Sequence, residues 1–352
     1  MKRFLIFLSL ILLLSSCLGP FKELKYQIED GWDEQLLNGQ PTPLIDIANE
    51  KDVKSLWTIQ NSSEKFWGSN DKLLESHRVD SFIFEDFLFT VNNKGGIKKI
   101  NLSDGKVLWE KSFDVDVSAG LSGDSDYLYF VTGSGLLWCI DHRGNELWKS
   151  YVGGQVFIKP LPNSTFVVVK LNNNKFVQLN SIDGTIKWQY EPPNPPLSMN
   201  TQGDIIYSDG VIYSGLPQGK LIAIAAETGL FLWEVTFSSS GGLNEIERID
   251  DVTSKPVIDG SIIYVISSSG NIAAIDRRSA LVNWSRPLSS SHGFNLSENS
   301  LVIVHETNSI YSLNNEAGKT NWKNEDLKYR NIGRGAIVSN YLVVGDFEGF
   351  LH

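Results

Sequence analysis

Cysteine, histidine and basic residues are scarce in this chain of 352 residues, and each shortage narrows the range of functions. Two cysteines and five scattered histidines exclude a disulfide-rich scaffold and most zinc sites. Lys and Arg number 31 against 41 Asp and Glu, so the formal net charge is −10. That balance argues against a nucleic-acid surface, because neutralising phosphates needs clustered cations. With 41% hydrophobic and only 20% charged residues, the chain can bury a substantial core.

Long hydrophobic runs are also missing, apart from one at the amino terminus. Phe4–Leu14 is almost entirely apolar and follows Lys2 and Arg3. This run is too short to cross a bilayer of about 30 Å, and its length is typical of the hydrophobic region of a signal peptide. We therefore expect residues 1–16 to be removed from the mature protein.

The residues that end this run resemble a bacterial lipobox, Leu14-Ser15-Ser16-Cys17. The resemblance implies a lipoprotein in which Cys17 becomes the amino terminus and carries fatty acyl chains such as palmitate. Several chains anchor firmly, since each buried CH₂ contributes about 0.8 kcal/mol. Leu18, where an Asp would retain a lipoprotein in the inner membrane, implies the outer membrane. The alternative is an ordinary secretory signal with an incidental cysteine.

The rest of the chain divides into a tether and one large domain. Residues 17–54 are polar and rich in turn formers, which is typical of a tether with at most local structure. Residues 55–352 are expected to form a β-propeller, for the reasons that follow. Within them Cys139 lies in a strand-like apolar run, and we expect a buried, inert thiol there because no nearby base is evident.

A repeat organises the large domain. Seven of the ten tryptophans end similar phrases spaced by roughly 40 to 50 residues, namely Trp57, Trp109, Trp148, Trp188, Trp233, Trp284 and Trp322. Five phrases carry a glycine four residues before the tryptophan: Gly105, Gly144, Gly184, Gly229 and Gly318. Ala280 takes that place before Trp284. Because tryptophan is the largest apolar side chain, we expect it to fill the contact between successive units.

Strand-like segments precede each phrase. Residues 262–266 and 272–276 alternate β-branched and other apolar residues, and Asp183-Gly184 and Asp209-Gly210 are strong hairpin signals. No convincing 3.6-residue period occurs outside the signal peptide. A unit of this length with about four short strands is typical of a β-propeller, in which ringed sheets cover each other's faces. The predicted fold class is all-β.

Two phrases, Leu102–Trp109 and Ala226–Trp233, resemble the tryptophan-docking repeat of pyrroloquinoline-quinone (PQQ)-type propellers and not WD40 or kelch repeats. With the lipobox in front, the chain from Cys17 to His352 resembles the BamB family, lipoproteins of the machinery that assembles β-barrels in the bacterial outer membrane. The resemblance implies an eight-bladed propeller that is lipid-anchored, faces the periplasm and is not an enzyme. It also implies binding to the periplasmic domains of BamA and a role in folding and inserting β-barrel proteins.

Two alternatives to a scaffold remain. A periplasmic quinoprotein dehydrogenase would carry PQQ and Ca²⁺ on the propeller axis, with a catalytic carboxylate and usually a vicinal disulfide. The sequence has no adjacent cysteine pair, no carboxylate cluster with ligand spacing and no nucleophile, phosphate-loop or zinc motif, so no catalytic residue, cofactor or metal is expected. The other alternative, a periplasmic ligand-binding propeller, would show exposed aromatics, for which Trp67 and Trp138 are candidates outside the repeat position.

Two long connections offer candidate contacts with a partner, because long loops on a rigid scaffold often carry function. They are residues 191–200, with four prolines in five positions, and 238–252. The BamB family has Leu-Ser-Leu-Arg in the first loop and Asp-Val-Asp in the second, facing BamA. This chain has Leu197-Ser198-Met199-Asn200 and Asp251-Val252-Thr253.

The resemblance makes Leu197, Met199 and Asp251 the best candidates for contact with BamA; Asn200 and Thr253 depart from the pattern and are weaker. The alternatives are that the two apolar residues pack under the prolines and that Asp251 is a solvated carboxylate. Unfolded outer membrane proteins are a further candidate partner, since open sheet edges can accept an added strand.

The chain length does not divide into whole units. Trp109 to Trp322 are predicted to end six blades, residues 335–352 begin a seventh, and Trp57 ends a strand that the amino-terminal side supplies to the last blade. About one repeat, roughly 40 residues, is then missing. We therefore expect a carboxy-terminally truncated propeller whose ring is open or poorly closed, with the strand of Trp57 lacking its partners.

Overall fold

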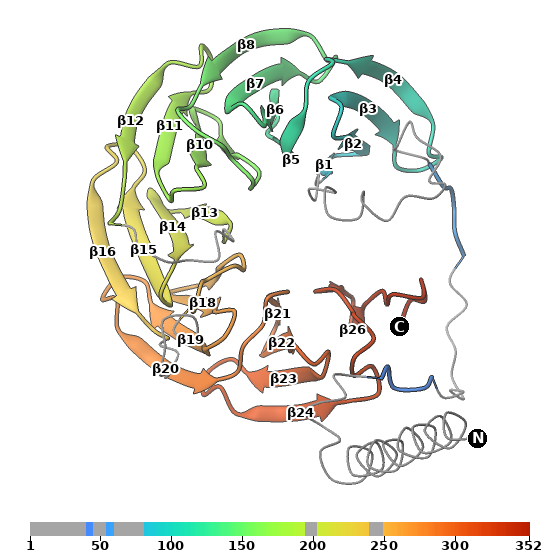
Figure 1. Cartoon of the computed structure of the whole chain (residues 1–352), viewed down its shortest axis with the longest axis vertical. Coiled ribbons are helices and arrows are strands. Elements are labelled where there is room, and N and C mark those ends of the chain that lie inside the picture. Colours follow the sequence, from blue (N-terminus) through green and yellow to red (C-terminus); the bar gives the residue numbers. More distant parts are fainter. Residues whose placement is uncertain (1–39, 45–53, 60–80, 194–202, 239–248) are drawn as a thin grey trace, which may run out of the picture.

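Strands are the regular elements of the described residues, which in this computed structural model are 40–44, 54–59, 81–193, 203–238 and 249–352. They form six four-stranded antiparallel sheets and one two-stranded sheet, each built from consecutive strands. The sheets follow one another around a ring (Figure 1). In the four-stranded sheets the first strand lies toward the centre and the fourth at the rim. This confirms the predicted all-β propeller. Within the described ranges no helix has the length and apolarity needed to cross a membrane.

We number the sheets 1 to 7 in chain order. Sheet 1 consists of β1 (Phe82–Phe84), β2 (Phe87–Val91), β3 (Gly96–Asn101) and β4 (Val107–Ser112). Sheet 2 consists of β5 (Val117–Gly123), β6 (Tyr127–Thr132), β7 (Leu136–Asp141) and β8 (Glu146–Tyr151). Sheet 3 consists of β9 (Leu161–Asn163), β10 (Phe166–Lys170), β11 (Phe176–Asn180) and β12 (Ile186–Tyr190).

The ring continues in the same pattern. Sheet 4 consists of β13 (Ile205–Ser208), β14 (Val211–Leu216), β15 (Lys220–Ala225) and β16 (Phe231–Thr236). Sheet 5 consists of β17 (Val257–Asp259), β18 (Ile262–Ile266), β19 (Asn271–Asp276) and β20 (Val282–Pro287). Sheet 6 consists of β21 (Phe294–Ser297), β22 (Ser300–Val304), β23 (Ile310–Asn314) and β24 (Thr320–Asn324), and sheet 7 of β25 (Ala336–Val338) and β26 (Tyr341–Val343).

The second and third strands of sheets 1 to 6 form the core. All five residues of β10 are buried, and its sequence, Phe-Val-Val-Val-Lys, does not alternate because neighbouring sheets cover both of its faces. Val167 and Val169 pack against sheet 2, whereas Phe166 and Val168 pack against sheet 4. The two-residue period of the strand thus distributes one apolar run between two interfaces.

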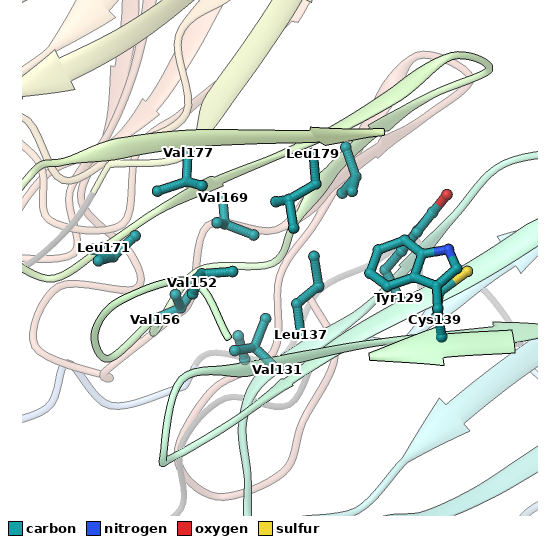
Figure 2. Packing of buried hydrophobic residues seen from close by; sticks show 13 residues of the cluster. Tyr129, Val131, Leu137, Cys139, Val152, Val156, Val169, Leu171, Val177 and Leu179 are labelled. Carbon is teal, nitrogen blue, oxygen red and sulfur yellow. The ribbon is translucent and has the colours of Figure 1, made fainter. Parts of the chain in front are cut away.

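The interface between sheets 2 and 3 shows this packing from close by (Figure 2). Leu137 and Cys139 on β7 face Val177 and Leu179 on β11. Cys139 is fully buried, and burial raises the pKa of its thiol to about 12. The expectation of a buried thiol at this position is confirmed.

The fourth strands carry the repeated tryptophans. Each of sheets 1 to 6 has one of them on its outer strand: Trp109, Trp148, Trp188, Trp233, Trp284 and Trp322. The prediction that these six residues each end one blade is confirmed. Each outer strand pairs with the third strand through a register shift just before the tryptophan, as between Lys99 and Ile100 of β3.

The two ends of the ring do not share a sheet. Among the described strands, no pairing joins β25 or β26 to sheet 1, and the chain beyond β26 makes an isolated bridge between Gly345 and Leu351. Residues 54–59 form no strand, yet Trp57 donates a hydrogen bond from Nε1 to the Leu102 carbonyl of sheet 1, at 2.8 Å. Trp57 therefore docks on sheet 1 without pairing to it as a strand.

A second part of the amino-terminal segment is fastened near sheet 7. The backbone N–H and Oγ1 of Thr42 both donate to the Lys328 carbonyl at 3.1 Å, and Nη1 of Arg330 donates to the Thr42 carbonyl at 3.0 Å. The Arg330 side chain, 4% exposed, is also paired with Asp346, whose side chain is fully buried (Nη2–Oδ2 2.7 Å), and with Glu348. The predicted tether thus includes a segment that is bound to the ring. We call these contacts of Thr42 the Thr42 clasp.

Candidate functional site

Five of the seven repeated tryptophans are hydrogen-bonded to the sheet that follows them in the chain. The indole Nε1 donates to a backbone carbonyl, at 2.8 to 3.1 Å, in five cases: Trp57 to Leu102, Trp109 to His142, Trp148 to Ser181, Trp188 to Ala226 and Trp284 to Asn315. The acceptor is always the first residue after the third strand of the next sheet. The tryptophans therefore join neighbouring sheets by a directed polar contact as well as by burial.

The repeated glycines lie under these indoles. All five have φ between +65° and +78°, a conformation that favours glycine. A Cβ atom at these positions would come within 2.4 to 3.1 Å of the docked ring: Gly105 against Trp57, Gly144 against Trp109, Gly184 against Trp148, Gly229 against Trp188 and Gly318 against Trp284. Glycine is therefore required for both backbone conformation and space.

Two positions depart from this docking. Ala280 takes the place of the repeated glycine in sheet 5 and adopts the same left-handed conformation, with φ of +58°. Nε1 of Trp233 makes no hydrogen bond to a described residue. Trp322 is 47% exposed, next to a sheet of two strands.

Four predicted site residues, Cys17, Leu197, Met199 and Asn200, lie outside the described residues. The other two, Asp251 and Thr253, lie in the segment that leads into β17. Asp251 is 2% exposed, and its carbonyl accepts the N–H of Ser268 at 2.9 Å. The alternative of a solvated carboxylate at Asp251 is therefore wrong, because the side chain is folded into the ring. Thr253 is half-buried, and its Oγ1 has no hydrogen-bond partner among the described residues.

Sequence reasoning missed Asp250, which fixes this segment between two sheets. It is 1% exposed, its carbonyl accepts the N–H of Gly219 at 2.5 Å, and its Oδ1 accepts the N–H and the hydroxyl of Ser269 at 3.2 Å. Ser238, at the other end of the long connection, accepts the N–H of Asn271 at 2.8 Å. Both ends of this loop are thus fixed to the same β18–β19 turn, and the run Ser267-Ser268-Ser269-Gly270 was the signal for it.

A fully buried lysine lies beside Asp251. Nζ of Lys170 donates to the Gly215 carbonyl at 2.7 Å, and the negative charges of Asp204 and Asp251 act on it. Burial lowers the pKa of Lys170 to about 7, against the opposing effect of the two carboxylates. An acidic residue in a loop is ordinarily in contact with solvent. Asp251 is instead buried, and its negative charge acts on Lys170.

A crevice of about 200 Å³ lies on the first strands of sheets 1 to 4, toward the ring centre, and carries the charges of Lys159, Asp204 and Lys255. Burial lowers the pKa of Lys255; Asp204 opposes this, and the positive charges of Lys159 and Arg334 reinforce it. Ca²⁺ in proteins takes six to eight oxygen ligands. This crevice offers one carboxylate among cations, and the described residues contain no group of three metal-ligating side chains. The residues present do not fit a Ca²⁺–quinone site.

The aromatic candidates for a ligand-binding propeller are not exposed where the structure describes them. Trp138 is 7% exposed and stacks on Phe130 with ring centroids 5.7 Å apart. Nζ of Lys149 lies over its ring, 4.5 Å from the ring centroid. Trp67 lies outside the described residues. Trp138 is therefore a packing residue.

Comparisons with known proteins agree on one family. The family model for outer membrane protein assembly factor BamB matches residues 93–324. The BamB of Burkholderia pseudomallei is 27% identical over 314 residues, which cover 89% of this chain and 80% of that protein. The BamB of Nitrosomonas eutropha is 31% identical over 265 residues, which cover 75% of this chain and 65% of that protein.

A solved structure supports the fold. The crystal structure of BamB from Moraxella catarrhalis superposes with a TM-score of 0.73 and covers 79% of this chain and 84% of that one. The sequences are 21% identical in this comparison, so it supports the propeller architecture alone.

Proposed function

Since this chain belongs to the BamB family of outer membrane protein assembly factors, we propose that it serves the assembly of outer membrane proteins as a scaffold and not as an enzyme. The observation that carries the proposal is the family match over residues 93–324, which spans most of sheets 1 to 6 and their docking tryptophans. The charged crevice supports it, since its donor set does not suit the metal of a quinoprotein.

In this proposal the protein is anchored at the outer membrane through acyl chains on Cys17, and the ring faces the periplasm. Its partner is BamA, whose periplasmic domains contact the loops at 191–200 and 238–252. The contacts of Ser238 and Asp250 with the β18–β19 turn support a loop presented from a fixed base.

The roles of the candidate residues differ. Leu197 and Met199 contact BamA directly, with Asn200 and Thr253 as weaker contacts. Asp251, being 2% exposed, acts mainly by holding the base of the second loop beside Lys170. Replacing an aspartate that positions a loop would lower both the stability of the protein and its binding to BamA. Replacing a contact residue would lower the binding to BamA alone.

Co-purification of BamA from detergent extracts tests the proposal. The double variant Leu197→Ala/Met199→Ala should lower BamA recovery at an unchanged melting temperature, and Asp251→Asn should lower both. Ile182→Ala, at a turn residue that is 71% exposed, is the matched control and should change neither. If the wild-type chain recovers no BamA the partner is wrong, and if the double variant recovers as much as the wild type the contact residues are wrong.

Two further tests address the alternatives. Titration with PQQ and Ca²⁺ should show no saturable binding and no dye reduction. If saturable binding and dye reduction were both observed, the protein would be an enzyme and not a scaffold. Unfolded outer membrane proteins are proposed as transient clients of the outer strand edges, where Leu147 and Leu232 are each 46% exposed. Photo-crosslinkers at these residues should capture an unfolded porin more often than one at Ile182.

A further inference from the structure

A cavity of about 330 Å³ lies between sheets 5 and 6, beside Trp284 and Tyr264. Three carboxylates line it, those of Asp259, Glu298 and Glu316, together with three asparagine side chains. No lysine or arginine is in the lining, and none of the three carboxylates forms an ion pair with a described residue. The cavity is therefore a negatively charged, aromatic-walled space.

The preceding interface, between sheets 4 and 5, shows what fills the corresponding place. Arg277 crosses from sheet 5 to sheet 4, where Nη2 lies 2.5 Å from Oδ2 of Asp209 and Nη1 lies 2.8 Å from Oγ of Ser208. Its side chain is 14% exposed, and its charge acts on Tyr213, whose ring lies 5.8 Å from that of Trp233. An arginine side chain thus closes this interface.

The strand registers make the two interfaces equivalent. Arg277 and Asn315 are each the first residue after the third strand of their sheets. Tyr213 and Tyr264 hold the same place beside the docking tryptophan, with ring separations of 5.8 and 6.2 Å. Ser208 pairs with Val211, two residues before Tyr213, and Asp259 pairs with Ile262, two residues before Tyr264.

At the interface of sheets 5 and 6, the shorter Asn315 therefore takes the place that Arg277 has at the interface of sheets 4 and 5. Asp259, with its carboxylate, takes the place of Ser208, which accepts a hydrogen bond from Arg277. We propose that the cavity between sheets 5 and 6 binds the guanidinium group of an arginine side chain presented by a partner protein. The proposal does not rest on the family's function.

The chemistry favours arginine over other cations. A guanidinium is a planar fork with five donors, which suits several carboxylate and amide acceptors at once, and it stacks on aromatic faces. The negative charges of Asp259 and Glu316, added to the larger effect of burial, raise the pKa of Tyr264, so a cation there is favoured. The described carboxylates are not grouped to hold a metal ion.

The test uses the purified full chain and N-acetyl-arginine methylamide as the probe, followed by isothermal titration and by the NMR signal of the Trp284 indole. The neutral citrulline analogue has nearly the same shape and should bind about tenfold more weakly or not at all, because it makes no charge-assisted bonds. Asp259→Asn should weaken arginine binding by about tenfold for the same reason.

The variant Asn315→Arg is the sharper control, since it places an arginine where Arg277 stands at the preceding interface. It should abolish binding of the probe without lowering the melting temperature. Equal binding of arginine and citrulline probes would overturn the proposal, as would undiminished arginine binding by Asn315→Arg or by a folded Asp259→Asn. Binding of Ca²⁺ at these residues in preference to the arginine probe would overturn it as well.

Discussion

Trp188 and Gly229 are in contact across the interface of sheets 3 and 4, so closely that a Cβ atom on Gly229 would lie 2.5 Å from the indole. Nε1 of Trp188 donates to the Ala226 carbonyl, at 2.9 Å, in the same turn. The glycine and the tryptophan are therefore one unit: the turn supplies both the acceptor and the space for the ring. This unit recurs between other sheets and accounts for the spacing of the repeat.

Replacing this glycine should be costly for two separable reasons. Gly229→Ala places a Cβ atom at positive φ and against the ring, and we expect a loss of about 3 kcal/mol in the free energy of unfolding. Gly210→Ala is the matched control, because Gly210 also has positive φ but has nothing within 4 Å of a Cβ atom, and it should cost about 1 kcal/mol. Urea denaturation measures both, and equal losses would show that contact with the ring is unimportant.

The reverse change should stabilise the protein where the repeat lacks its glycine. Ala280 takes the place of the repeated glycine in sheet 5, with φ of +58°. Ala280→Gly should raise the free energy of unfolding by about 1 kcal/mol, since the left-handed conformation is strained for alanine. Ala226→Gly, in the equivalent turn of sheet 4 but without positive φ, should lower it instead. A thermal melt in which both variants shift the same way would contradict this.

The stability of the ring should depend on the protonation of Lys170. Burial lowers its pKa to about 7 from 10.5, so between these values the unfolded chain binds more protons than the folded one, and stability rises with pH. Between pH 7 and 9 the wild type should gain up to about 1.4 kcal/mol per pH unit relative to Lys170→Met. Urea titrations at several pH values measure the difference, in which other titrating groups cancel. A constant difference would contradict the lowered pKa.

The Thr42 clasp should depend on Arg330. Burial alone would raise the pKa of Asp346, but hydrogen bonds from His352 and Arg330 outweigh it and hold the pKa well below its usual range. Arg330→Gln leaves this buried carboxylate without its guanidinium, so we expect a lower melting temperature and faster hydrogen exchange at the Thr42 amide.

The ion pair of Arg330 and Asp346 also predicts how the stability of the protein changes at acid pH. A lowered carboxyl pKa contributes stability above its unfolded value, 3.8, which is lost as the pH falls below it. The wild type should therefore lose its advantage over Arg330→Gln below about pH 4. Arg278→Gln, at an exposed arginine of the β19–β20 turn, is the control and should affect neither measurement.

The repeat made the architecture predictable, because Trp109 to Trp322 and their glycines mark local turns that fold in the same way in each unit. What the sequence could not show were contacts between units. Asp251 looks like a loop carboxylate because its neighbour Lys170 is distant in the chain. Likewise Arg277 and Asn315 occupy equivalent positions of the repeat. Only the packing of neighbouring sheets against each other shows that Arg277 fills an interface and that Asn315 leaves one open.

The Thr42 clasp also sets a length. If Cys17 is held in the bilayer, as proposed, the chain from Cys17 to Thr42 has about 25 residues and can span at most about 90 Å. Without the clasp, the first contact with the ring would be near Trp57, and the chain from Cys17 to Trp57 could span about 140 Å. Fastening one threonine thus lowers the greatest height of the propeller above the membrane by about a third.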